Sequence, residues 1–228
     1  MIDVKQLQTI IDNLITQSMR DFANTPDLDK NRLRQLRQKD VLDSFSPNQF
    51  LSKMNLINHI KSLNILNKDS EIVIFGSWYG SILIPAFYDE VKKITCIDMD
   101  SDVIHRAKYE LFKDLDVDFI CDDIFGEFRN QYKNTDLFIN TSCEHMKPMK
   151  EWGPAPQYKN PWWTRVKEGS HFAFQSNAMF DIPTHTNCVN NIEEFKKQLS
   201  ILHKVIIEDE IPDERGTRFT LIGQICKP

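Results

Sequence analysis

Residues 71–80 read EIVIFGSWYG, and this stretch decides the fold. The run IVIF at 72–75 is short, apolar and rich in β-branched residues, which is typical of a parallel strand buried on both faces. Gly76 ends the run, and glycine permits a tight turn in which backbone N–H groups come close to a ligand. The stretch therefore predicts a buried strand followed by a ligand-binding turn.

Strand-like and helix-like segments alternate from this point to the end of the chain. Strands are expected at 71–75, 94–98, 118–121, 136–139, 171–175, 204–208 and 218–225, and helices at 102–111, 125–132 and 192–199. This alternation predicts an α/β fold, a doubly wound open sheet with helices on both faces. The connection at 211–217 is too short for a helical crossover, so the last two strands should pair as a terminal antiparallel hairpin.

The residues before the first strand follow a different pattern. Residues 2–66 are polar overall, with apolar positions at helical spacing, and Ser46-Pro47 is typical of a helix start. We therefore predict an N-terminal helical extension at 1–67 and an α/β domain at 68–228. The extension could close a pocket or form a contact between identical subunits. Within the α/β domain, an irregular segment at 147–168, rich in Trp and Pro, is expected to form an inserted lid over the acceptor site, or else to cover an edge of the sheet with its aromatic rings.

The composition disfavours several classes of protein. The 228 residues include 28 Lys and Arg against 33 Asp and Glu, a formal net charge of -5. Nucleic-acid coats and proteins of anionic membrane surfaces need a basic face instead. No apolar run approaches the roughly 20 residues of a membrane span, and the N-terminus lacks the pattern of a signal peptide. Five scattered cysteines without a C-x-x-C pair fit a reduced, cytoplasmic protein.

Glycine and acidic residues follow the first three predicted strands, at the edge where an open α/β sheet binds ligands. Gly76 and Gly80 bracket the turn after the first strand. Asp98 ends the second strand, where a carboxylate can accept hydrogen bonds from both hydroxyls of a ribose. Asp123 follows the third strand and can accept from the amine of an adenine. Their order predicts a nucleoside cofactor, while Trp78 does not fit the G-x-G-x-x-G turn of a nicotinamide site.

With these motifs, residues 68–226 resemble a class I S-adenosylmethionine-dependent methyltransferase. Gly76 and Gly80 match the first and last glycines of that family's loop. Ile74 and Trp78 depart from it, because they stand where an acidic residue and the middle glycine are common. The run NTSCEHM at 140–146 is similar to the Leu-Glu-His run of small-molecule methyltransferases and does not match the Asn/Asp-Pro-Pro-Tyr motif of amino-directed DNA methyltransferases.

The resemblance implies a Rossmann-like methyltransferase sheet that binds S-adenosyl-L-methionine. In the family, the acid after the second strand binds the ribose and the next residue packs beside the adenine, here Asp98 and Met99. The implied cofactor-binding residues are Gly76, Ser77, Trp78, Gly80, Asp98, Met99, Asp123 and Asn140.

The acceptor is expected beside the ends of the fourth and fifth strands. Glu144, His145 and His185 are the candidate catalytic residues, because imidazole titrates near neutrality and suits a general base. Each histidine also has a structural alternative, since His145 can cap the next helix and His185 can order its loop. The candidate substrate-binding residues are the amides Asn177 and Asn187 and the lid tryptophans Trp152 and Trp162.

Metal ligands are present in the same region. Cys143, Glu144, His145, His185 and Cys188 include good zinc ligands. No pair of them has the spacing of a recognised zinc motif, so the sequence predicts no metal.

The function that follows is methyl transfer from S-adenosylmethionine to a small-molecule acceptor. Three alternatives remain at this point. They are another chemistry on the same cofactor (aminobutanoyl transfer or cofactor cleavage), cofactor binding without catalysis, and nucleic-acid methylation. A basic run at 30–39 would serve the last of these, although its interspersed acids favour a solvated helix face. We therefore expect a small-molecule partner, no nucleic acid or membrane, and possibly a homo-oligomer.

Overall fold

The structure is a computed structural model that describes residues 39–124, 130–151, 166–199 and 203–226. Its strands are β1 (Glu71–Phe75), β2 (Lys93–Asp98), β3 (Asp118–Cys121), β4 (Leu137–Asn140), β5 (His171–Asn177), β6 (His203–Asp213) and β7 (Gly216–Ile225). Its α-helices are α3 (Pro47–Ser62), α4 (Leu83–Phe87), α5 (Ser101–Arg106) and α6 (Ile192–Lys196). Shorter helical turns are η1 (Ala107–Leu111), η2 (Asn130–Lys133), η3 (Cys143–His145) and η4 (Met149–Glu151). Trp152 and Trp162, expected in the lid, lie outside the described residues.

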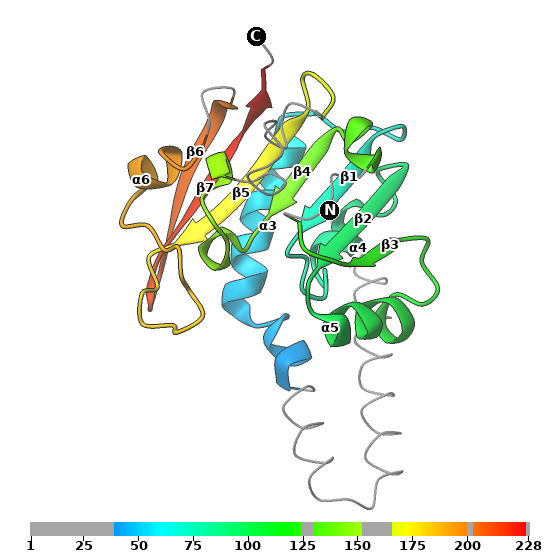
Figure 1. The fold of residues 1–228 in the computed structure, drawn as a ribbon, viewed down its shortest axis with the longest axis horizontal. Coiled ribbons are helices and arrows are strands. Elements are labelled where there is room, and N and C mark those ends of the chain that lie inside the picture. Colours follow the sequence, from blue (N-terminus) through cyan, green and yellow to red (C-terminus); the bar gives the residue numbers. More distant parts are fainter. Residues whose placement is uncertain (1–38, 125–129, 152–165, 200–202, 227–228) are drawn as a thin grey trace, which may run out of the picture.

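All seven strands form one sheet, in the order β3-β2-β1-β4-β5-β7-β6 (Figure 1). Strands β1 to β5 are parallel, and β7 runs antiparallel to both β5 and β6. Because β1 pairs with β2 on one side and β4 on the other, the winding of the sheet reverses at β1 and β4. The carboxyl ends of strands at such a switch point are where α/β proteins bind ligands. The predicted doubly wound sheet with a terminal antiparallel hairpin is confirmed.

Both faces of the central strands β1, β4 and β5 are buried, whereas the edge strands β3 and β6 are partly exposed. In β1, Ile72 and Ile74 join one hydrophobic core, while Val73 and Phe75 join the other. The first core also takes in α3 and α4, and the second holds aromatic side chains from β4, β5 and β7. Burial on both faces explains why the parallel strands read as apolar runs.

Helix α3 carries the N-terminal extension onto the sheet (Figure 1). Its residues Leu56, Ile57 and Ile60 are buried in the first core. Ser52 Oγ donates a hydrogen bond to Gln175 Oε1 at 3.1 Å, and Gln175 Nε2 donates to the Ser52 carbonyl at 3.2 Å. These bonds join the helix to β5, so α3 and the sheet share one core.

Several element boundaries differ from the prediction. Strand β6 reaches Asp213 and β7 begins at Gly216, so the hairpin loop holds two residues instead of the segment 211–217. Pro212 lies inside β6, which is possible because β6 is the edge strand of the sheet. The helix predicted at 102–111 becomes π-helical after Arg106, and α6 ends at Lys196. Of the helix predicted at 125–132, the structure describes only its end, as η2.

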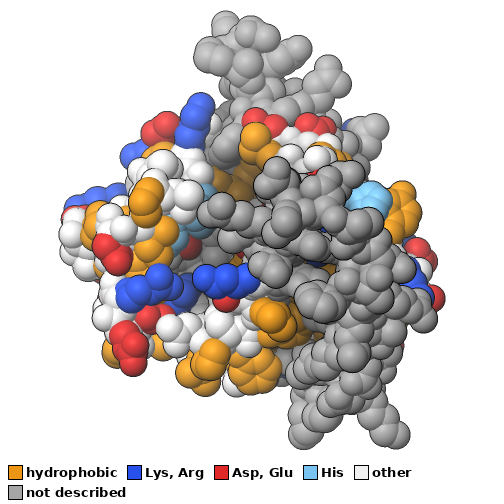
Figure 2. Space-filling view, turned by 90° about the horizontal axis from the view of Figure 1, so that it is seen from below, with side chains coloured by type: hydrophobic (Ala, Val, Ile, Leu, Met, Phe, Trp, Pro, Cys, Tyr) orange, Lys and Arg blue, Asp and Glu red, His pale blue; other side chains and the backbone are white. Residues whose placement is uncertain are grey.

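The described surface carries charges of both signs. On the face shown in Figure 2, Lys and Arg side chains lie among Asp, Glu and apolar side chains. Within the described ranges, no helix combines the length and the apolar character that crossing a membrane requires.

Candidate functional site

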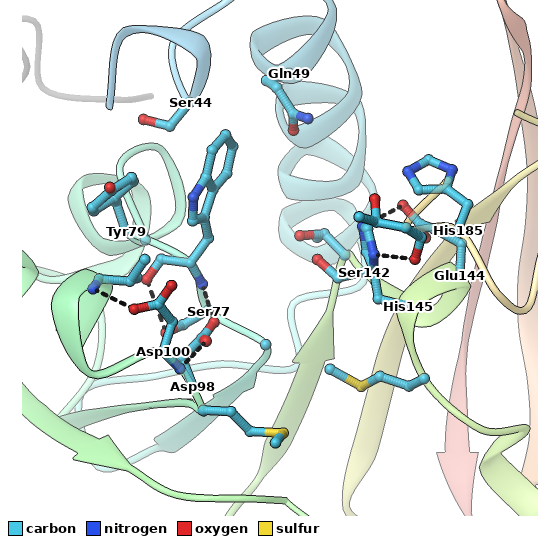
Figure 3. Close-up of a pocket in the computed structure, with 18 of the residues that line it drawn as sticks. Ser44, Gln49, Ser77, Tyr79, Asp98, Asp100, Ser142, Glu144, His145 and His185 are labelled. Carbon is cyan, nitrogen blue, oxygen red and sulfur yellow. Dashed lines mark hydrogen bonds and ion pairs between the residues drawn. The ribbon is translucent and has the colours of Figure 1, made fainter. Parts of the chain in front are cut away.

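A pocket of about 680 Å³ lies at the carboxyl ends of the parallel strands. Its lining comes from the loops after β1, β2, β3 and β4, from the end of β5, from α3 and from the β6–β7 hairpin. Figure 3 shows Asp98, Asp100 and Ser77 on one side of it and Glu144, His145 and His185 on the other. The volume is that of a typical small-ligand site.

The turn after β1 has the backbone that the glycine pattern predicted. Gly76 and Gly80 have φ values of +53° and +67°, in the left-handed region that glycine enters without strain. Trp78, which stands where the resembling family has a glycine, has the same kind of backbone with φ +48°. For a bulky residue this conformation costs about 1–2 kcal/mol. The turn therefore keeps a glycine-like course without the middle glycine.

Hydrogen bonds hold Trp78 in this conformation. Its backbone N–H donates to Asp98 Oδ2 at 2.8 Å, and its indole N–H donates to Asp40 Oδ2 at 3.2 Å. The Tyr79 hydroxyl donates to the same Asp40 oxygen at 2.8 Å. Burial, together with this bond to Asp40, raises the pKa of Tyr79. Asp40 thus anchors both aromatic side chains of the turn, a role that no local motif in the sequence indicated.

Asp98 lies in the pocket, at the end of β2, as predicted. Its Oδ1 accepts the backbone N–H of Asp100 at 3.0 Å, so each carboxylate oxygen has one backbone donor. A carboxylate oxygen has two acceptor positions, which leaves room for a further bond at each. Helix α5 is capped by Asp100, which accepts from the backbone N–H groups of Asp102 and Val103. Asp98 is therefore not the cap of that helix.

Of the remaining residues predicted to bind the cofactor, some line the pocket and one does not. Ser77, Met99 and Asp123 line the pocket, and Met99 is 70% exposed. Asn140 does not line it. Asn140 is fully buried, its Oδ1 accepts the Ser142 N–H at 2.8 Å, and its Nδ2 contacts Met146 Sδ at 3.1 Å. Asn140 thus orders the turn after β4, below the pocket.

The residues predicted for catalysis come together at the opposite end of the pocket. His145 Nε2 lies 4.0 Å from Glu144 Oε1, and the rings of His145 and His185 lie edge to face with centroids 4.7 Å apart. Burial raises the pKa of Glu144, and the nearby charges of His145, Arg218 and Lys53 oppose this shift. Burial, with a smaller contribution from His145, lowers the pKa of His185.

The two candidate amides behave differently. Asn177 lines the pocket, and its Oδ1 faces His185 Nδ1 at 3.1 Å. Asn187 does not line it, and its side chain exchanges two hydrogen bonds with the Gln198 amide and donates to the Cys143 carbonyl at 3.2 Å. Asn187 therefore joins the segment after α6 to the loop after β4 and does not border the pocket.

Three basic residues that line the pocket were missed by the sequence analysis. They are Lys53 of α3, Arg215 of the β6–β7 loop and Arg218 of β7. Arg218 Nε donates to Asp213 Oδ2 at 3.4 Å, whereas Lys53 bonds only to Gln49 among the described residues. Burial, with Arg218 adding to it, lowers the pKa of Lys53 to about 8. In the sequence, Lys53 stands next to Met54, which belongs to the apolar stripe of α3. This stripe indicates a helix packed on the core and does not by itself indicate a binding site.

Known proteins resemble this chain in structure only. No protein-family model matches it, and no curated protein matches its sequence. An S-adenosylmethionine-dependent methyltransferase from Clostridium acetobutylicum ATCC 824 has a TM-score of 0.59 at 11% identity, with 87% of this chain and 99% of that chain covered. The N-methyltransferase NodS from Bradyrhizobium japonicum WM9, in complex with S-adenosyl-L-homocysteine, has a TM-score of 0.58 at 13% identity, covering 94% and 100%. An rRNA methylase from Streptococcus thermophilus has a TM-score of 0.50 at 12% identity, covering 72% and 92%.

Identities of 11–13% establish a shared fold and leave the activity to be argued from the site. The parallel sheet with its terminal antiparallel hairpin is the methyltransferase-like sheet that the resemblance implied. This chain has the fold of the class I S-adenosylmethionine-dependent methyltransferases.

Proposed function

We propose that this protein is an S-adenosylmethionine-dependent methyltransferase that acts on a small-molecule acceptor. One observation carries the proposal. A single pocket has a glycine turn and the Asp98 carboxylate at one end, and Glu144, His145 and His185 at the other. The first group suits a nucleoside cofactor and the second suits an acceptor that loses a proton.

The residues present fit the cofactor. A Cβ at Gly76 would lie 2.5 Å from Met146 Cε, so the missing side chain lets Met146 pack against the turn. Asp98 borders the pocket and has acceptor capacity left for the two ribose hydroxyls. Met99 and Asp123 extend the same wall, where they would contact the adenine ring and its amine.

When bound, S-adenosylmethionine supplies an electrophilic methyl group on a sulfonium sulfur. The work left to the chain is to align an acceptor with that methyl group and to accept a proton if the acceptor carries one. His185 and His145 present imidazoles for this proton, and the amide of Asn177 orients His185. Glu144 lies beside His145, where its negative charge stabilises a protonated ring.

The size and charge of the pocket support a small acceptor. About 680 Å³ accommodates a nucleoside cofactor and a small molecule together. The formal charge of -5 and the mixed charges of Figure 2 offer little for a nucleic-acid backbone. The structural neighbours include both a NodS N-methyltransferase and an rRNA methylase, so this choice depends on the pocket and on the charge.

Calorimetric titration with S-adenosylhomocysteine tests the cofactor site. We expect saturable binding by the wild type and a loss of at least about 100-fold in Asp98→Ala, because both ribose bonds disappear. Asp114→Ala removes an exposed aspartate outside the pocket and should bind like the wild type. Thermal unfolding of each variant separates lost binding from lost folding. Equal affinities of the wild type and Asp98→Ala would contradict the ribose assignment.

Product analysis tests the reaction. The protein is incubated with S-adenosylmethionine and the small-molecule fraction of a cell extract. S-adenosylhomocysteine as the product supports methyl transfer, while methylthioadenosine would indicate aminobutanoyl transfer or cofactor cleavage. Binding of S-adenosylhomocysteine without turnover on small molecules or RNA would indicate a non-catalytic protein.

A further inference from the structure

We propose that Glu144, His145 and His185 bind a divalent transition-metal ion at the acceptor end of the pocket. One potential ligand atom from each of the three side chains lies within 4.8 Å of the other two. Bonds of about 2.0–2.2 Å to a common ion require each atom to move by roughly 1 Å or less. Two imidazole nitrogens and one carboxylate oxygen are a ligand set that Zn²⁺ and its first-row neighbours prefer.

The Glu144 carboxylate has an oxygen that a metal would satisfy. Glu144 is 5% exposed, and among the described residues its Oε2 has no hydrogen-bond partner. An unpaired oxygen in a buried site is destabilising, and more so when it is charged. Oε1 of the same carboxylate already points to within 4.0 Å of His145 Nε2. A cation between these groups would remove the penalty.

Hydrogen bonds hold both imidazoles in the form that ligates a metal. His145 Nδ1 lies 3.0 Å from the carbonyl oxygen of Thr184, which can only accept, so Nδ1 carries the proton and Nε2 has the free lone pair. His185 Nδ1 lies 3.1 Å from Asn177 Oδ1. This Asn177 atom also accepts the Met179 N–H at 2.9 Å, which identifies it as the oxygen. His185 is therefore held in the same form.

Such bonds from the second ring nitrogen to a fixed oxygen are the usual outer-shell support of metal-ligating histidines. The supporting oxygens come from the β5 end and from the loop after it, while Glu144 and His145 belong to η3 after β4. The topology thus assembles the cluster from two loops, although the ligands are 40 residues apart along the chain. The absence of a local zinc motif explains why the sequence predicted no metal.

The neighbouring positive charges oppose a cation only in part. Lys53 and Arg218 lie near Glu144 and Arg215 lies near His185, but Arg218 is paired with Asp213 and the Glu144 carboxylate supplies a negatively charged ligand. Three protein ligands leave at least one coordination position open. The ion would lie in the same pocket as Asp98 and the glycine turn. If the proposed methyltransferase function holds, an acceptor with an oxygen or nitrogen donor would occupy the open position and be oriented by the ion. With their Nε2 atoms on the ion, His145 and His185 would then position the metal and would not accept the proton of the acceptor.

Metal titration tests the site directly. The purified chain is freed of metal with a chelator, then titrated with ZnCl2 by calorimetry and with CoCl2 by visible absorption. We expect one ion per chain, with a Co²⁺ spectrum of low coordination number. Glu144→Gln and His185→Gln remove a ligand each and should weaken binding by more than about 100-fold. Asn177→Leu removes the support of His185 without removing a ligand and should weaken binding by about 10–100-fold, and thermal unfolding controls for the loss of the bonds that Asn177 Oδ1 accepts from Met179 and Cys188.

Controls distinguish this site from incidental binding. His105→Gln removes an exposed histidine of α5 that does not line the pocket, and its titration should match that of the wild type. The site is refuted if the wild type binds no ion, or if Glu144→Gln and His185→Gln bind as the wild type does. The second result would assign the ion to other surface groups, such as the exposed Cys121 and Cys226.

These titrations contain no S-adenosylhomocysteine, so they succeed or fail independently of the proposed function. A chelated protein that still binds S-adenosylhomocysteine but loses turnover would support a role of the ion in holding the acceptor. Unchanged turnover after chelation would refute that role.

Discussion

The two ends of the pocket are built in different ways. The cofactor end is made of short segments that each follow directly on a strand, residues 76–80 after β1 and residues 98–100 at the end of β2. Its contacts are mostly bonds between a side chain and nearby backbone, such as those of Asp98 with Trp78 and Asp100. The acceptor end gathers Lys53, Glu144, His185 and Arg218 from α3, η3, the loop after β5 and β7.

This difference predicts that substitutions at the two ends have different effects. The cofactor end depends on local backbone geometry, so changes there should affect folding and cofactor affinity together. The acceptor end consists of charged and titratable groups on separate elements of a common core. Changes there should alter chemistry or electrostatics and leave the cofactor end intact.

The largest effect is expected for Glu144→Gln. Losing the carboxylate of the acceptor cluster should lower turnover by about 100- to 10,000-fold, the range typical of catalytic acid–base groups. Affinity for S-adenosylhomocysteine, measured by calorimetry, should stay within about twofold of the wild type, because Asp98 and the glycine turn are untouched. Glu168→Gln changes an exposed glutamate outside the pocket and serves as the matched control. A parallel loss of cofactor affinity would show that the two ends are coupled.

The next effect is expected at the cofactor end, for Gly80→Ala. Gly80 has φ +67°, and a Cβ there would lie 2.6 Å from Cδ1 of the fully buried Ile84. Backbone strain and overpacking together should lower the free energy of unfolding by about 2–4 kcal/mol. Urea denaturation measures this loss.

Gly169→Ala separates the two causes. Gly169 also has a positive φ, +79°, but its nearest neighbour would be 3.4 Å from the new Cβ. It should lose only the strain of about 1–2 kcal/mol. Equal losses at Gly80 and Gly169 would show that contact with Ile84 contributes nothing.

The sequence predicted the cofactor end of the pocket better than the acceptor end. Gly76, Gly80 and Asp98 were placed correctly at one pocket, because parallel strands bring their carboxyl ends to one edge of the sheet. Lys53 was missed because helical periodicity records burial and says nothing about which strand ends a helix crosses. The hairpin boundary was misplaced because β6 continues through Pro212 to Asp213, and an edge strand tolerates a proline. Asn140 was assigned to the cofactor from the family resemblance, and Asn187 to the substrate because it is an amide in an apolar stretch. Neither argument shows whether an amide bonds to a ligand or to the protein itself.

A third prediction concerns the electrostatics of the acceptor end. Burial and the charge of Arg218, opposed by Glu144, lower the pKa of Lys53 from 10.5 to about 8. Between these values the unfolded chain holds a proton that the folded chain has released. The free energy of unfolding should therefore rise from pH 8 to 10.5, and the penalty for burying the charge is complete below pH 8.

Lys53→Met should remove this penalty. We expect the free energy of unfolding at pH 7 to increase by about 1–3 kcal/mol, and its rise above pH 8 to flatten. Lys113→Met, at an exposed lysine outside the pocket, should change neither. If Lys53→Met is destabilised instead, the attraction between Lys53 and Glu144 stabilises the fold by more than the burial of the Lys53 charge costs. That result would also weigh against a cation at the Glu144 carboxylate.

The smallest effect is expected for Asn187→Ala, and it tests the boundary of the acceptor end. The Asn187 amide bonds to Gln198 in both directions and to the Cys143 carbonyl, while its backbone N–H donates to the Glu144 carbonyl at 2.8 Å and would remain. Loss of the side-chain bonds should lower the free energy of unfolding by about 1–2 kcal/mol, partly because the Gln198 amide is left unpaired. Asn187→Asp keeps one acceptor for Gln198 and should recover part of this loss.

Kinetics distinguish this supporting role from substrate binding. Because Asn187 does not line the pocket, Asn187→Ala should leave the KM for the acceptor unchanged at temperatures well below unfolding. A substrate-binding amide would raise KM without lowering stability, and that result would restore the role that the sequence predicted. A residue that lies next to Glu144 therefore belongs to the acceptor end only if its side chain reaches the pocket. Contact through the backbone alone, as at Asn187, is not enough.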